Sequence, residues 1–227
     1  MPVVGADGGA PVVEEGGAPW PPGRVAPVVY GVVSTVLLSV AVGEWFAIRL
    51  SLVAVAGRLV SEDLFDALLA MHLARTVLLV ILPAGAALSH EALPVQVGAR
   101  GVALRRTTVV AALVWAVGAA LTSWGWAGGD DVGWFAYAPN SGVVLFAAGG
   151  AGSFVRGPLL MSVGLLLSAA CLLLTTLRAG RRRSPRAWPR AVWPQVALQV
   201  LVIACLVPSA IDLVRLWLTG EGRMWWL

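Results

Sequence analysis

Two side chains that could bind a metal ion or a haem iron lie far apart in this sequence. They are His72 and His90, the only two histidines among the 227 residues. Imidazole is the commonest metal ligand, and a single histidine can hold haem iron on one side. On one helix their separation corresponds to about 27 Å at 1.5 Å per residue. The two histidines therefore cannot share one metal ion or one haem.

An arginine, Arg75, follows His72 three residues later, in a stretch apolar enough to cross a membrane. If the helix begins near Leu68, the guanidinium lies about 10 Å inside the membrane. A charge at that depth is costly and usually faces a partner. The sequence leaves four partners open for Arg75: a cofactor carboxylate, an acidic residue of another subunit, Glu44 on the preceding apolar run, or the membrane surface, reached by snorkelling.

The remaining candidate residues favour simpler roles. His90 stands next to Glu91, and we expect it to be a solvated residue at the membrane interface. Cys171 and Cys205 fall inside apolar runs, which predicts buried small hydrophobic side chains rather than a disulfide or a metal pair. The sequence contains no glycine-rich phosphate loop, no His/Cys metal spacing and no nucleophile triad.

Composition defines the class of protein that must position these residues. The chain is 59% hydrophobic and 12% charged, whereas a soluble domain is about half apolar and a quarter charged. Runs of about 20 apolar residues predict membrane-spanning helices, and a barrel would show alternating segments half as long. We therefore predict an all-α integral membrane bundle of five transmembrane helices, at residues 26–48, 68–89, 108–128, 158–178 and 194–218.

The segments outside these runs predict the domain organisation. Residues 1–25 are rich in Gly and Pro, lack the pattern of a signal peptide, and are expected to form a flexible cytoplasmic N-terminus. Residues 26–218 form the membrane domain, in which the Gly-rich segment 129–157 between the third and fourth helices is expected to fold over the outer ends of the bundle. Residues 219–227 form a short outer tail.

Arginine placement predicts the orientation. All sixteen basic residues are arginine, and they gather after the second span (Arg100, Arg105, Arg106) and in "RAGRRRSPRAWPR" after the fourth. The positive-inside rule places both loops in the cytoplasm, with the N-terminus inside and the C-terminus outside. We expect a bacterial plasma membrane, because the Ala-, Gly-, Val- and Arg-rich composition is typical of GC-rich bacterial genomes. The high isoelectric point reflects this topology and does not indicate nucleic-acid binding.

Acidic and aromatic residues fit the same orientation. The acids expected on the outer side are Glu62, Asp63, Asp66, Asp130 and Asp131. Tryptophans expected near span ends, as in an aromatic belt, are Trp124, Trp126, Trp134, Trp188, Trp193, Trp225 and Trp226.

Four motifs occur in order: "GEWFAIRLSL", "LVSEDLFDALLAMH", "LPVQVGARGVAL" and "GWFAYAP". Together they make the chain, from about residue 25 to 218, resemble subunit I of the haem-copper oxidases, the cytochrome c oxidase type. The match runs without a gap from Met71 to Ala103. It implies the fold of the first five of that family's twelve helices.

The resemblance also implies roles for individual residues. His72 matches the helix 2 histidine that ligates the low-spin haem, Arg49 matches a helix 1 arginine near the haem edge, and Glu44 matches an acidic position on helix 1. Arg75 would contact the haem edge or a partner subunit. No catalytic residue is expected, and no metal other than haem iron at His72.

The sequence also departs from the family pattern. Leu73 replaces the glycine after the ligand histidine, and Arg75 replaces a small residue. The family's proton channel opens with an asparagine and an aspartate, at positions held here by His90 and Gly101. The family's copper ligands and its remaining haem ligands belong to helices beyond the fifth. The resemblance is therefore to a truncated and degenerate subunit I.

These observations favour a structural or accessory subunit of a respiratory electron-transfer complex, without an oxygen-reducing centre or oxidase activity of its own. The expected partners are other subunits of a membrane redox complex and lipid, but no nucleic acid. Two alternatives remain open. The chain could be a haem-binding electron-transfer subunit that uses His72, or the N-terminal half of a split oxidase whose later helices come from a second gene.

Overall fold

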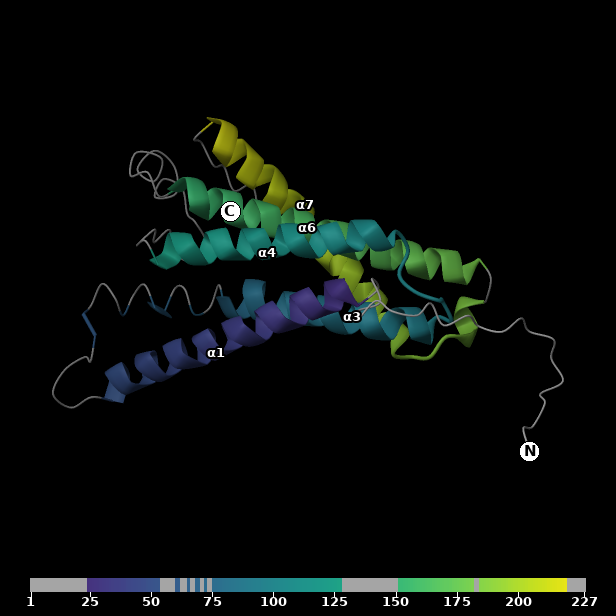
Figure 1. Cartoon of the computed structure of the whole chain (residues 1–227), viewed down its shortest axis with the longest axis horizontal. Coiled ribbons are helices and arrows are strands. Elements are labelled where there is room, and N and C mark those ends of the chain that lie inside the picture. The colour runs from purple at the N-terminus through teal and green to yellow at the C-terminus, as the bar shows by residue number, and fades with distance from the viewer. Residues whose placement is uncertain are drawn as a thin grey trace, which may run out of the picture.

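A computed structural model (Figure 1) describes residues 24–53, 60, 61, 65, 68, 69, 72, 75–127, 151–181 and 184–219. Within these residues five helical segments are long and apolar enough to cross a membrane, by length and composition, and no strand occurs. The elements are α1 (Val25–Val53), η1 (Arg75–Ile81), α3 (Leu82–Gln96), α4 (Arg105–Ala127), α6 (Ala151–Gly180), η2 (Pro185–Ala187) and α7 (Val192–Thr219). The predicted all-α class with five spans is confirmed.

Element boundaries differ most from the expected ones at two places, and α1 also continues beyond its expected end to Val53. The second span ends later than expected, because α3 continues to Gln96. The fourth span begins earlier, since α6 starts at Ala151, within the segment 129–157 that was expected to lie over the bundle. Residues 1–23, 128–150 and 220–227 lie outside the described residues. The predicted terminal domains, the predicted cover and the outer acids at 62, 63, 66, 130 and 131 lie there or in the other undescribed positions, and they remain predictions.

The helices form two groups that meet along one side. α4 lies along α6 over most of its length, and α6 also packs against α7, which crosses it obliquely (Figure 1). α1 packs against η1, α3 and α4, and α3 also contacts α6. α1 and the second span therefore lie side by side, with α1 against α4 and the second span against α6.

Glycines bring α4 and α6 into close contact. A methyl group added to Gly164 would lie 2.6 Å from the Ala111 carbonyl oxygen, and one added to Gly118 would lie 2.6 Å from the Gly157 carbonyl oxygen. Small residues at such crossings let helix backbones approach, and in lipid this packing replaces the hydrophobic driving force available in water.

Two apolar clusters fill the interior. The first surrounds Trp115 and Tyr30, both fully buried, whose ring centroids are 5.2 Å apart. The second joins Leu93, Leu172 and Val192 at the end of the bundle near the loop between α3 and α4.

The second cluster includes Trp188, which was predicted to belong to an aromatic belt. Trp188 does lie near the ends of two spans, between α6 and α7, but it does not lie on the surface of the bundle as a belt residue would. Trp188 is buried, its ring centroid lies 5.9 Å from that of Trp193, and its ring edge covers Gly180. The short helix η2 turns the chain back onto the bundle here, which buries the indole. Trp124 and Trp193 are exposed, as side chains of a belt must be.

We predict that Gly164→Ala lowers the stability of the bundle by about 1–3 kcal/mol, because the added methyl group overlaps α4 backbone atoms that cannot move independently. Gly31→Ala is the matched control, since nothing lies within 4 Å of a methyl group there. The control is expected to be neutral or more stable by at most about 1 kcal/mol. Loss of the helical circular dichroism signal on heating in one detergent measures both, and equal melting temperatures would contradict the packing argument.

Candidate functional site

A buried ion pair connects the first two spans. Glu44 of α1 pairs with the guanidinium of Arg75, the first residue of η1, and the two residues are 8% and 6% exposed. A charge inside a membrane bundle is very costly unless an opposite charge compensates it. The pair therefore ties α1 to the second span. Among the partners left open by the sequence, Glu44 is the one the structure provides, and the burial of Arg75 excludes snorkelling.

His72 lies beside this ion pair. Its Nδ1 atom is 3.9 Å from Oε2 of Glu44, and its side chain is 24% exposed. His72 and Arg75 are three residues apart, a spacing that places both on one face of a helix. Neither His72 Nδ1 nor Glu44 Oε2 has a hydrogen-bond partner among the described residues. Glu44, His72 and Arg75 thus form a compact ionisable cluster between α1 and the second span.

The backbone at this cluster is π-helical. Residues Arg75–Ile81 form η1, a geometry that is rare and often occurs at functional sites. Pro83 in the first turn of α3 has no N–H group to donate to the Leu79 carbonyl, so the regular α-helical bonding pattern is interrupted at this point. The Thr76 hydroxyl donates to the His72 carbonyl at 2.7 Å and competes with the backbone ladder.

Arg49 lies on a different face of α1. It is exposed, and its guanidinium carbon lies 5.6 Å from the ring centroid of Trp45, a cation–π distance. Glu44 is buried on the inner face of the same helix. His72 therefore faces Glu44 rather than Arg49, and contact of Arg49 with a haem edge stays a prediction.

His90 was expected to be solvated, and this expectation was wrong. The side chain is 5% exposed. Its Nδ1 atom lies 2.7 Å from the Ala86 carbonyl oxygen, its Nε2 atom lies 3.2 Å from the Ser168 hydroxyl, and its ring centroid lies 5.8 Å from that of Tyr30. Because α3 continues to Gln96, His90 lies inside the helix and packs against α6 instead of marking the end of the span.

Two further polar contacts join α3 to α7. Gln199 Nε2 donates to the Ser89 hydroxyl at 3.3 Å, and Gln195 Nε2 donates to Gln96 Oε1 at 2.8 Å. Polar side chains that bond across helices are a usual means of fixing helix register in a membrane. Sequence reasoning missed these contacts, although isolated polar residues within apolar runs, such as Gln199 and Ser89, were the available signal.

Sequence reasoning also missed one buried acid. Asp212 of α7 is buried, and its Oδ1 atom lies 3.9 Å from Nη1 of the exposed Arg215. An ionisable residue within a span often marks a partner contact or a functional position. Cys171 and Cys205 are both free thiols; Cys171 is buried as predicted, but Cys205 is exposed, so the prediction of burial was wrong for Cys205.

The resemblance implies a haem at His72, and the arrangement of its neighbours tests this. A low-spin haem needs two axial ligands and a flat apolar slot. His90 already bonds Ala86 and Ser168, and the charged side chains of Glu44 and Arg75 fill the contact between α1 and η1 next to the imidazole. These residues do not fit a low-spin haem held by this chain alone.

The five long apolar helices indicate a multi-pass membrane protein. The family model described as "Cytochrome C and Quinol oxidase polypeptide I" matches residues 25–225. The match includes all five spans, and the chain belongs to this family, as its motifs predicted. Proteins of this family function in multi-subunit membrane complexes. No curated protein matches the chain.

We predict that Arg75→Met destabilises the protein by about 3–5 kcal/mol, because it leaves the Glu44 carboxylate buried without a counter-charge. The double variant Glu44→Gln/Arg75→Met is expected to recover much of this loss, since it removes both charges. Thermal unfolding in one detergent measures the difference.

The control for this prediction is Arg49→Met, which removes an exposed arginine from α1 and should cost less than about 1 kcal/mol. If Arg75→Met and Arg49→Met unfold at the same temperature, the buried ion pair is not what joins the two spans.

Proposed function

We propose that the chain is a structural or accessory subunit of a respiratory electron-transfer complex, and that it keeps the subunit I helix bundle without an oxygen-reducing centre of its own. One observation carries this proposal. The histidine that corresponds to the family's haem ligand stands beside a buried ion pair, Glu44–Arg75, that belongs to the chain itself.

The contact between Glu44 and Arg75 supports a structural role for the chain. In a haem-binding bundle the cofactor bridges the helices that surround it. Here α1 and the second span are bridged by Glu44 and Arg75, so these helices can pack without a cofactor between them. Arg75 stands where the family has a small residue, and it is this change that supplies the bridge.

The small number of histidines that could bind metal supports the proposed absence of oxidase activity. An oxygen-reducing centre of the family type needs a copper ion and a haem facing each other, held by several histidines. This chain contributes two histidines. One faces Glu44, and the other is hydrogen-bonded between α3 and α6.

The outer faces of the bundle offer surfaces to partner subunits or lipid. In the apolar stretches that could cross a membrane, only 11% of α7 and 28% of α1 is buried within the chain. Exposed apolar side chains continue along both helices. Two spans with so little internal cover fit a chain that packs against other membrane subunits.

The second candidate is a haem-binding electron-transfer subunit, and the position of His72 favours it. Metal-ligating histidines usually donate their second ring N–H group to a carboxylate or carbonyl. His72 Nδ1 points toward Glu44 Oε2 at 3.9 Å, so a modest shift would produce this arrangement. In this candidate a partner subunit supplies the other axial ligand.

Purification in mild detergent separates the two candidates. For the accessory subunit we expect membrane redox subunits to co-purify, and no haem band in the reduced-minus-oxidised spectrum of the chain after it is separated from them. A stoichiometric haem band that disappears in His72→Ala but persists in Arg106→Gln, which removes an exposed arginine with no predicted haem contact, would establish the second candidate instead. Oxygen consumption by the separated chain, with copper and haem in stoichiometric amounts, would refute both.

The orientation proposed is an N-terminus in the cytoplasm and a C-terminus outside, in a bacterial plasma membrane. Arg24, Arg100, Arg105 and Arg178 line pockets at one end of the bundle, which supports placing that end inside. In a Cys171→Ser/Cys205→Ser background, a membrane-impermeant thiol reagent added outside should label Gly152→Cys and not Gly180→Cys. The opposite pattern would reverse the topology.

A further inference from the structure

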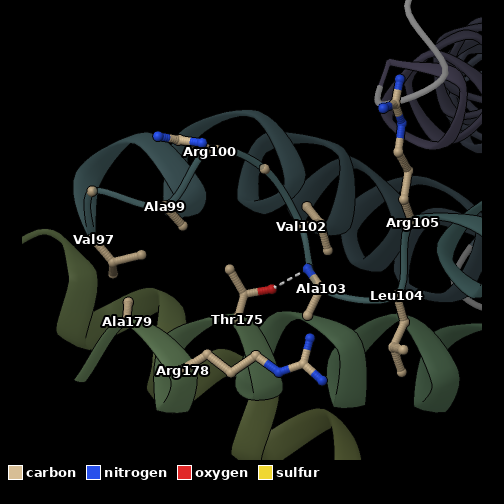
Figure 2. Close-up of a pocket in the computed structure, with 12 residues that line it drawn as sticks. Val97, Ala99, Arg100, Val102, Ala103, Leu104, Arg105, Thr175, Arg178 and Ala179 are labelled. Carbon is tan, nitrogen blue, oxygen red and sulfur yellow. Dashed lines mark hydrogen bonds between the residues drawn. The ribbon is translucent and has the colours of Figure 1, made fainter. Parts of the chain in front are cut away.

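A pocket opens at the arginine-rich end of the bundle. It has a volume of about 580 Å³ and lies between the loop that joins α3 to α4 and the C-terminal part of α6. Figure 2 shows Val97, Val102 and Thr175 around its interior, with the Arg178 side chain extending along α6 beneath Ala103. Arg100 and Arg105 belong to its lining from the loop side.

A second pocket of about 370 Å³ lies against the same loop. It shares Arg100, Gly101 and Arg105 with the first pocket and adds Arg24 from the start of α1. One acidic residue, Glu91, also lines it. The loop thus has four arginines and one carboxylate around it, and both pockets carry a positive charge.

The loop is held in one shape. The Thr175 hydroxyl accepts a hydrogen bond from the Ala103 N–H group at 2.8 Å, drawn as a dashed line in Figure 2. Leu104 has a φ of 54°, a left-handed conformation that is costly for a residue with a Cβ atom. Strain of this kind persists only where the surrounding structure imposes it, and it occurs often at ligand-binding segments.

The start of α4 adds to the positive potential. This 23-residue helix begins at Arg105, directly after the loop. The first N–H groups of a helix have no partner inside the helix, and its dipole favours an anion there. Arginine binds phosphate oxygens through two parallel N–H groups, which makes it suited to phosphate recognition.

We propose that these adjoining pockets bind the phosphate group of an anionic phospholipid. The pockets lie at the ends of the spans, where headgroups meet water, and the first is walled by apolar side chains such as Val97, Val102 and Leu104. A soluble phosphate ion does not need apolar walls, whereas the glycerol and the first acyl carbons of a lipid do. Basic pockets between transmembrane helices on the cytoplasmic side are known to bind anionic headgroups.

Gly101 offers a sharp test. It lines both pockets, is exposed, and has nothing within 4 Å of an added Cβ atom. Gly101→Glu therefore places a carboxylate in the wall that both pockets share, and Gly101→Gln is an uncharged control of the same size. Phosphatidylglycerol is titrated into the detergent-solubilised protein and counted by native mass spectrometry, with phosphatidylcholine as the neutral lipid.

We expect the wild-type protein to retain phosphatidylglycerol in preference to phosphatidylcholine. Gly101→Glu should weaken this binding about fivefold to tenfold, and Gly101→Gln should leave it within about twofold, since a charge near the membrane surface contributes about 1 kcal/mol. Equal binding by the two variants would overturn the proposal. Displacement of the lipid by millimolar inorganic phosphate would overturn the assignment to a lipid.

A second pair of variants keeps the test independent of position 101. Arg100→Gln/Arg178→Gln removes two lining charges and should weaken phosphatidylglycerol binding at least as much as Gly101→Glu. Arg106→Gln removes an exposed arginine next to the pockets that does not line them, and its binding should match the wild type. An equal loss in both would show a general effect of surface charge and no site.

Discussion

The pairing of two charges inside the membrane is the constraint on which the rest of this bundle depends. Glu44 and Arg75 are each too costly to bury alone, so the first two spans must meet where these side chains can reach each other. This contact fixes the depth of η1 against α1 and brings His72 toward the same carboxylate. The side chain that makes the site unlike an oxidase haem pocket is therefore also the one that holds the two helices together.

Close glycine contacts, rather than an ion pair, join the helices in the other half of the bundle. α4 and α6 carry no charge pair between them in the part of the chain that the structure describes, and they approach through glycines at which even a methyl group would overlap the facing backbone. Polar bonds such as His90–Ser168 and Gln199–Ser89 then set the rotation of α3 against α6 and α7. Dispersion contacts supply the attraction, while these few polar bonds select one register among several that would pack almost equally well.

Hydropathy was sufficient to predict the number and type of the spans, because a backbone in lipid has few alternatives to a helix. The sequence also reduced the possible partners of Arg75 to a short set that included Glu44. The choice among these partners depended on the rotation and depth of the helices. A uniformly apolar run has no periodicity that reveals either. His90 was placed in solvent because the span was ended too early, although Pro94 proved compatible with the last turn of α3. Trp188 shows the same limit, since its burial depends on a turn that η2 makes back onto the bundle.

The π-helical segment η1 changes the direction in which side chains point along the second span. It begins at Arg75 of the ion pair and ends before His90. Each residue of an α-helix advances the side chain by about 100° around the axis, so in a regular helix the direction of Arg75 would fix that of His90. The wider turns of η1 change this relation: both η1 and α3 pack against α1, but Arg75 pairs with Glu44 of α1, whereas His90 reaches Ser168 of α6 and also lies beside Tyr30 of α1. The second span thus consists of two short helices joined end to end, each with its own rotation about the axis. One span can therefore direct side chains to two different neighbours.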